Sequence, residues 1–145
     1  MSNLTVLLMM VCGGMAVALQ PSINARLAQR IGAYESSMIS FAVGTIAMLA
    51  VVLVSGKGSL RGVMATEWWE LTGGVLGAFF VTLTIISVPR LGTAAVMAAV
   101  ITGQLMTGAL LDHLGAFGLR QLPFSPLRLL GMVLLAAGAA LIIRR

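Results

Sequence analysis

The most informative polar residues of this chain lie close together in one apolar stretch near its N-terminus. Gln20 and Asn24 are one helical turn apart, so a helix places both amides on the same face. Pro21 cannot donate a backbone hydrogen bond to the carbonyl of Val17, which predicts a kink in that helix. A proline-interrupted apolar segment beside amides points to a transporter binding site. The alternative is that both amides cap a helix end at the membrane edge.

A second candidate amide, Gln104, falls deep within a later apolar run. An amide in lipid must find partners on neighbouring helices or in a wet cavity, so Gln104 either contacts a substrate or joins helices. Aromatic rings would supply apolar or cation–π contacts to a substrate. The aromatic candidates are Trp68, Trp69 and Phe79, of which the tryptophan pair also fits an interfacial belt.

The groups that enzymes need are scarce in this chain. Asp112 and His113 are adjacent, so their side chains point apart on a helix, and no activated serine or cysteine motif accompanies them. One histidine and one cysteine, Cys12, cannot form a zinc site. No acidic residue falls inside an apolar run, which argues against proton coupling by a carboxylate within the membrane. We expect neither catalysis nor a metal or other cofactor.

The elements that would position these residues are membrane-spanning helices. Of the 145 residues, 59% are hydrophobic and 9% are charged, whereas soluble domains carry roughly 25% charged residues. Crossing the hydrocarbon takes about 20 apolar residues, and backbone groups in lipid must pair within their own helix. The apolar runs therefore predict one all-α transmembrane domain with five helices. The domain covers 1–145, and its helices cover about 3–31, 34–55, 69–88, 90–111 and 127–143.

Two local features qualify this assignment. Residues 16–18 (AVA) resemble a signal-peptidase site, but no lysine or arginine precedes the run, which favours a retained helix. Pro89 lies in the shortest connection and can begin the fourth helix, where its missing N–H costs nothing. The sequence shows no internal repeat.

Positive charges are almost evenly divided between the two sides of the membrane. With five spans, one side receives four basic residues and the other receives five. These are Lys57, Arg61, Arg120 and Arg128 on the first side, and Arg26, Arg30, Arg90, Arg144 and Arg145 on the second. Orientation follows the bias of such charges, so either other features set the topology or the chain inserts both ways and pairs as an antiparallel dimer. The basic residues stand between apolar runs and form no basic face, which argues against nucleic-acid binding.

Small residues recur at helical spacing, and in lipid such residues let helices approach closely. They form stripes on four of the predicted helices, and we expect them to pack helices or to contact a second subunit through the fourth or fifth helix. The stripes are Ser36, Ser40 and Gly44; Gly73 and Gly77; Ala95, Ala99 and Gly103; and Gly131 and Gly138.

Several short segments, in order along nearly the whole chain, carry a resemblance to a known family. They are ALQP (18–21), NARL (24–27), SFAVGT (40–45), GG (73–74), GAFFV (77–81), VPRLG (88–92), GQ (103–104), DHLG (112–115) and RLLG (128–131). In this order they resemble the YdcZ family of inner-membrane exporters in the drug/metabolite transporter superfamily. The resemblance implies a five-helix subunit and an antiparallel dimer, but it supplies no substrate. It also places recurrent polar positions at Gln20, Asn24, Arg90, Gln104, Asp112 and His113.

Residues and resemblance together predict a multi-pass protein of a bacterial inner membrane that transports a small molecule of unknown identity. Export is what the resemblance implies, because the residues themselves indicate neither the direction of transport nor a coupling ion. Two subunits would form an antiparallel homodimer resembling a ten-helix transporter with inverted repeats. Rocking of the two halves would expose a path between them to each side in turn. Two alternatives stay open: a dual-topology ion channel, for which polar positions are few, and an accessory membrane subunit that transports nothing.

Overall fold

The structure of the chain, a computed structural model, describes residues 2–56, 58–118 and 120–144. Over these residues the elements are α-helices joined by turns and short 3-10 segments, and there is no strand. Five helices are long and apolar enough to cross a membrane. The predicted all-α protein with five spans is therefore confirmed. The chain divides into two compact units, Met1–Arg90 and Leu91–Arg145.

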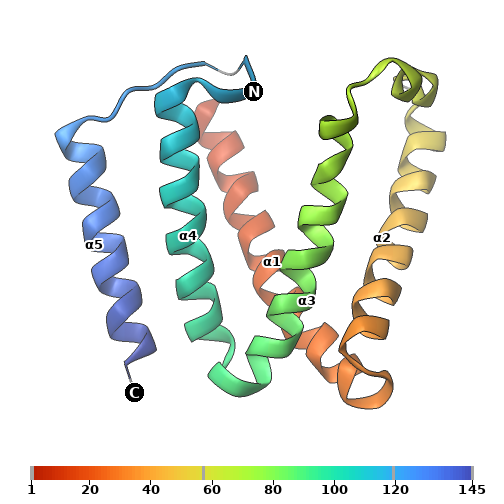
Figure 1. Cartoon of the computed structure of the whole chain (residues 1–145), viewed down its shortest axis with the longest axis horizontal. Coiled ribbons are helices and arrows are strands. Elements are labelled where there is room, and N and C mark those ends of the chain that lie inside the picture. Colours follow the sequence, from red (N-terminus) through yellow and green to blue (C-terminus); the bar gives the residue numbers. More distant parts are fainter. Residues whose placement is uncertain (1, 57, 119, 145) are drawn as a thin grey trace. The chain divides into compact units, whose positions relative to one another are not determined.

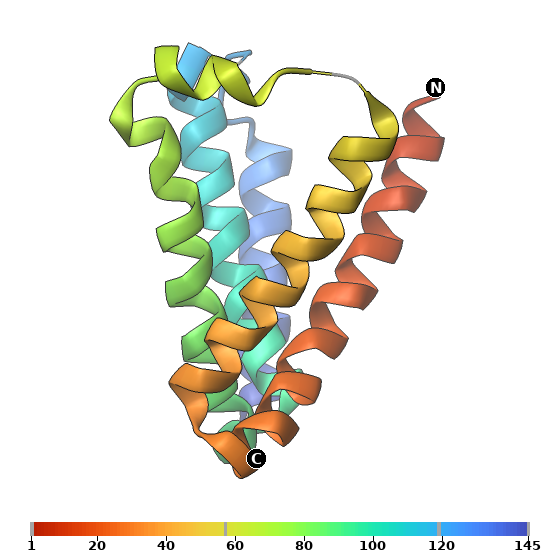
Figure 2. The same cartoon turned by 90° about the vertical axis from the view of Figure 1, so that its right-hand side faces the viewer.

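The first unit begins with two helices that are joined by a single residue. α1 (Asn3–Ile31) and α2 (Ala33–Ser55) meet at Gly32, whose φ of 100° and ψ of 157° lie in a region that only glycine populates readily. α1 packs against α2, and Figures 1 and 2 show both helices leaving this turn. α1 continues through Pro21 without a break, and the kink there stays a prediction.

At the other end of α2, a loop with two 3-10 segments leads to the third span (Figure 2). These are η1 (Leu60–Ala65) and η2 (Trp68–Thr72), followed directly by α3 (Gly73–Leu91). η2 begins with a capping box, because the Glu67 N–H donates to Glu70 Oε2 at 2.8 Å and the Glu67 side chain accepts in return. The capped turn fixes the point at which the chain enters the third span.

The junction between the third and fourth spans differs from the prediction. Pro89 does not begin the fourth helix but lies in the last turn of α3, which continues to Leu91. Gly92 then adopts φ 82° and ψ 154°, and α4 (Thr93–Leu114) begins after it. The glycine, which can take a conformation outside the helical region, ends α3, and the proline removes only one N–H near the helix end.

The second unit contains α4, η3 (Ala116–Gly118) and α5 (Pro126–Ile143), and α4 packs against α5. Gly115 ends α4 in the left-handed conformation, with its N–H donating to the carbonyl of Asp112 at 3.3 Å. The Ser125 hydroxyl accepts the N–H of Arg128 at 3.3 Å, and Pro126 occupies the first turn of α5. Both ends of the connection are thus capped as soluble helices are capped.

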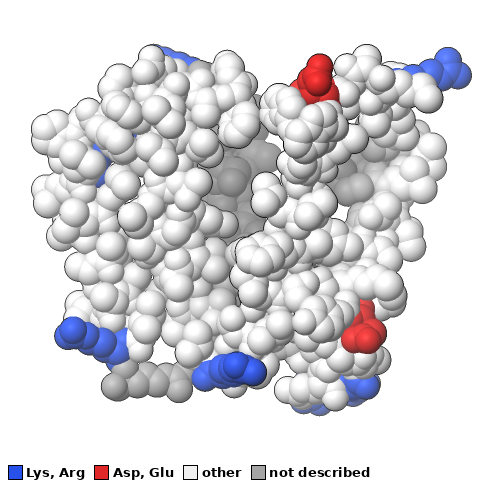
Figure 3. Space-filling view, viewed as in Figure 1, with Lys and Arg blue, Asp and Glu red and all other residues white. Residues whose placement is uncertain are grey.

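The surface of the helices is suited to lipid rather than to water. Only 6% to 17% of the residues in the most apolar window of each span are buried, so large apolar side chains face outward along every helix. On the face shown in Figure 3, charged side chains lie near the ends of the helices and uncharged atoms cover their middles. Lys57 and Arg145, two residues of the predicted charge balance, lie outside the described residues.

α3, Gly92 and α4 repeat local features of α1, Gly32 and α2 at a spacing of 60 residues. The two glycines share one backbone conformation and both stand alone between two helices. Four buried positions match as well, whereas Ser37, Ala98 and Ala109 correspond to residues that are not buried. The matched residues are Pro21, Asn24, Ala25 and Ser36, which correspond to Val81, Thr84, Ile85 and Val96. These matched positions share burial and backbone conformation but not residue type, so the similarity is one of structure and not of sequence.

Candidate functional site

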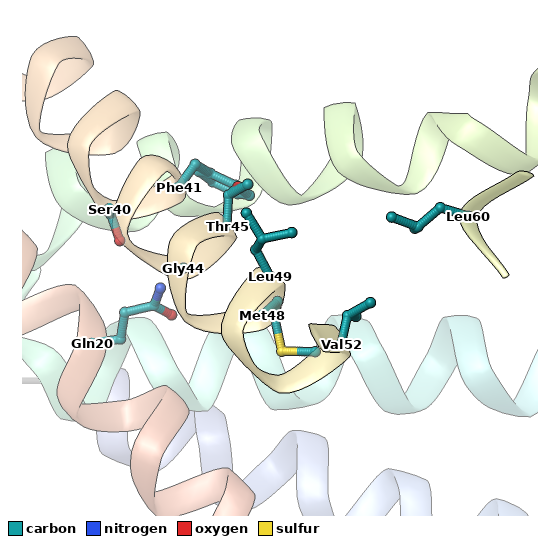
Figure 4. A pocket seen from close by; sticks show the side chains of 9 residues that line it. All are labelled: Gln20, Ser40, Phe41, Gly44, Thr45, Met48, Leu49, Val52 and Leu60. Carbon is teal, nitrogen blue, oxygen red and sulfur yellow. The ribbon is translucent and has the colours of Figure 1, made fainter. Parts of the chain in front are cut away.

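A pocket of about 580 Å³ opens in the first unit between α1, α2 and η1 (Figure 4). None of the described residues that line it is charged. Its polar groups are Gln20, Ser40 and Thr45, and the remainder of the wall is apolar. The apolar lining consists of Phe41, Gly44, Met48, Leu49, Val52 and Leu60. A wall of this composition suits a small molecule that is largely apolar and carries few hydrogen-bonding groups.

The polar groups gather at one end of the pocket. Figure 4 shows the Gln20 amide directed from α1 toward Gly44 and Ser40 on α2, with Leu60 at the far end. An amide supplies donors and an acceptor together, and a hydroxyl supplies one donor and two acceptor lone pairs. A molecule with one polar end can therefore be oriented along this pocket, with its apolar part toward Leu60.

Asn24 lies behind this polar end and holds it in place. Its side chain is 6% exposed, and its Nδ2 donates to Ser40 Oγ at 3.1 Å. Because the Ser40 oxygen accepts that bond, its own hydrogen can be donated to a molecule in the pocket. The backbone carbonyl oxygen of Asn24 accepts a hydrogen bond from the Ser36 hydroxyl at 2.8 Å, and Ser36 is 0% exposed. Asn24 is thus a positioning residue, while Gln20 and Ser40 line the space.

The turn at Gly32 explains why these residues meet. Gln20 and Asn24 are four residues apart on α1, and Ser36 and Ser40 are four residues apart on α2, so each pair lies on one helical face. Folding the two helices at a single residue brings the faces together close to the turn. The arrangement satisfies the buried polar atoms inside lipid without any charge.

α2 is also tied to α3 within the first unit. Thr82 Oγ1 lies 2.9 Å from Ser37 Oγ and 2.8 Å from the carbonyl oxygen of Ala78. A Cβ added at Gly77 would lie 3.3 Å from the Phe41 ring, so the absence of a side chain at this glycine leaves room for that ring against α3. Phe41, which lines the pocket, is therefore supported from behind by α3.

The other residues predicted as substrate contacts are not among the residues that line this pocket. Trp68 and Phe79 are 75% and 65% exposed, and Trp69 is 43% exposed. Gln104 is exposed on α4 in the second unit. A role for these four in binding a substrate stays a prediction.

The residues that the sequence analysis missed are the hydroxyl partners. Ser36, Ser40 and Gly44 were interpreted as a stripe for helix packing, whereas Ser40 and Gly44 line the pocket and Ser36 supports it. The available signal was the matching four-residue spacing of hydroxyls on one helix and amides on the other, on either side of a one-residue turn. Hydropathy alone does not distinguish such a pair of faces from ordinary packing.

The glycines predicted to pack helices behave differently from one another. Gly77 has the Phe41 ring against it, as described above. A Cβ added at Gly73, Gly103, Gly131 or Gly138 would meet nothing within 4 Å. Ala95 is half-buried and Ala99 is exposed. A contact of these surfaces with a second subunit stays a prediction.

Comparison with known proteins places these features in a family. The family described as "Putative inner membrane exporter, YdcZ" matches residues 5–141. The chain is also 30% identical, over 152 aligned positions, to the inner membrane protein YdcZ of Escherichia coli (strain K12). That alignment covers 100% of this chain and 99% of the relative. No solved structure matches the chain.

Proposed function

Because this chain belongs to the YdcZ family of inner-membrane exporters, we propose that it exports a small, largely apolar molecule by alternating access in an antiparallel homodimer. The observation that carries the proposal is the uncharged pocket of about 580 Å³ with an amide and a hydroxyl at one end. Its size is within the range of small-molecule sites, and its wall suits an apolar body with a polar end.

In the proposed cycle, Gln20 and Ser40 bind the polar end of the substrate, and Asn24 keeps the Ser40 hydroxyl in register through the 3.1 Å bond. The apolar wall from Met48 to Leu60 contacts the remainder of the molecule. None of the described lining residues carries a charge that would have to be desolvated when the pocket fills, so the energetic barrier to exchange is kept low.

An argument from symmetry supports the proposed antiparallel dimer. Transporters that alternate between two faces are commonly built from inverted repeats around a shared site. A chain with five spans has its two termini on opposite sides of the membrane. A second copy inserted in the opposite orientation would therefore supply the inverted half. The nearly even division of basic residues, four against five, permits both insertions.

The first experiment tests dual insertion with matched charge variants. Arg61→Gln with Arg120→Gln leaves two basic residues on one side against five on the other. Arg30→Gln with Arg144→Gln leaves four against three, and Ser59→Lys raises this to five against three. We expect tagged termini of the natural chain on both sides of the membrane, and a single, opposite orientation for each variant. A natural chain with one orientation would contradict the homodimer.

The second experiment tests transport. Mass spectrometry of the culture medium compares cells that produce the natural chain with cells that produce Gly44→Leu or Gly14→Leu. Gly44 lines the pocket and Gly14 does not, and an added Cβ meets nothing at either position. We expect at least one extracellular compound to rise with the natural chain and with Gly14→Leu, but not with Gly44→Leu.

The orientation variants extend this measurement. Each variant alone should fail to export, and the two produced together should restore export, because only the mixture contains opposite orientations. Export by a single-orientation variant would rule out the antiparallel pair. Single-channel currents from the purified chain would instead favour the ion channel.

A further inference from the structure

The second unit contains a groove whose α4 wall corresponds in sequence position to the α2 wall of the first pocket. In the repeat of 60 residues, four α2 residues of the pocket correspond to four α4 residues that line a space of about 340 Å³. The corresponding pairs are Thr45 and Leu105, Met48 and Gly108, Leu49 and Ala109, and Val52 and Asp112. α5 supplies the opposite wall of the groove through Arg128, Gly131 and Met132.

The chemistry of this groove differs from that of the first pocket at one end. Where α2 has Val52, α4 has Asp112, and Arg128 of α5 faces it with Nη2 at 2.6 Å from Asp112 Oδ2. The two side chains are 40% and 38% exposed, so both charges are accessible at the rim. The floor below them is apolar and contains two glycines, Gly108 and Gly131. The groove thus joins a pair of opposite charges to an apolar surface.

A ligand with a single charge does not suit this rim, because Asp112 repels an anion and Arg128 repels a cation. A head group with both charges side by side satisfies both residues. Arg128 already directs Nη1 to the carbonyl of Leu122 at 3.0 Å, but a guanidinium has five N–H donors and can add a phosphate oxygen. Asp112 can accept from an ammonium while it stays near Arg128. The apolar floor then receives a hydrocarbon chain.

We propose that the groove between α4 and α5 binds the ammonium–phosphate head group of an ethanolamine phospholipid, with an acyl chain lying along Gly108 and Gly131. Asp112 and Arg128 stand at the ends of membrane-spanning helices, the depth at which head groups lie. The site is separate from the proposed substrate pocket, so it holds whether or not that pocket exports a molecule.

The test measures lipid retention by native mass spectrometry of the purified full chain. Phosphatidylethanolamine, phosphatidylglycerol and phosphatidylcholine with identical acyl chains are each added at equal concentration. We expect the ethanolamine lipid to be retained about tenfold more than the other two, because glycerol offers no cation and choline offers no N–H donor. Equal retention of all three lipids would overturn the proposal.

Matched variants locate the site. Gly108→Leu fills the groove, whereas Gly14→Leu places the same side chain on α1, and an added Cβ meets nothing at either glycine. Selective retention should be lost in the first variant and kept in the second. If Gly108→Leu does not fold, Gly131→Leu fills the groove from α5 instead. Retention that survives in the folded groove variant would refute the assignment.

A final arm separates a lipid from a soluble ligand. Free O-phosphoethanolamine has the same two charges but no acyl chain. If it competes with the phospholipid at micromolar concentration, the charged rim alone carries recognition and the acyl chain in the proposal is wrong. If it competes only above millimolar concentration, the lipid assignment is supported.

Discussion

The Ser36 hydroxyl provides the sharpest test of how the pocket between α1 and α2 is stabilised. Ser36 is 0% exposed and donates to the Asn24 carbonyl at 2.8 Å, across the α1–α2 contact. Ser36→Ala removes this bond and leaves a small void, while the Asn24 carbonyl keeps the helical bond of α1. The change therefore isolates one interhelical hydrogen bond inside the membrane.

The expected loss follows from these contacts. Interhelical hydrogen bonds in a membrane protein contribute about 0.6 kcal/mol on average and at most about 1.7 kcal/mol. The bond is short and fully buried, and the void adds to the loss, so we expect about 1 kcal/mol. A loss of this size changes the unfolding equilibrium constant about fivefold.

Unfolding in mixed micelles, with increasing sodium dodecyl sulfate and detection by tryptophan fluorescence, measures this loss. Ser55→Ala is the matched control, since Ser55 lies on the same helix, is exposed, and donates only to its own helix at the Val52 carbonyl. We expect the control to stay within about 0.5 kcal/mol of the natural chain. A loss in Ser55→Ala equal to that in Ser36→Ala would refute the reasoning.

Two further predictions concern the turn and the polar end of the pocket. Gly32→Ala and Gly92→Ala should each lower the free energy of unfolding by about 1–3 kcal/mol in the same assay, because both glycines occupy a region closed to other residues, whereas Gly14→Ala should not. Similar losses at the two turns would support the 60-residue repeat, and a tolerant Gly92→Ala would count against it. In a double-mutant cycle, Asn24→Ala and Ser40→Ala should show a coupling energy of about 0.6 kcal/mol, and a coupling near zero would remove Asn24 as the residue that positions Ser40.

Several parts of the architecture could be predicted from the sequence alone. The count of spans follows from the number of apolar residues needed to cross the hydrocarbon, and the helical state follows from the lack of water for the backbone. The proximity of Gln20 and Asn24 on one face follows from helical spacing. These properties depend on residues close together in the chain, which is why they could be predicted before the structure was known.

The ends of the helices were less predictable. Pro89 was expected to begin a helix, but it lies within the last turn of α3 because Gly92 ends that helix. Proline is compatible with a first turn and with a position near the end, so residue type does not decide between them. The backbone angles of Gly92 decide where α3 ends, and therefore in which helix Pro89 lies.

The sequence by itself determined that this chain crosses a membrane with five helices. It also determined that Gln20 and Asn24 lie beside Pro21 on the first of these helices. Only the tertiary structure decided that Ser36 and Ser40 face Asn24, that Trp68 and Phe79 stay outside the pocket, and that Asp112 meets Arg128. Hydropathy fixes how often the chain crosses the lipid but not how each helix is rotated about its axis. That rotation is set by turns such as Gly32 and by contacts between residues far apart in the chain, and it determines which polar groups meet.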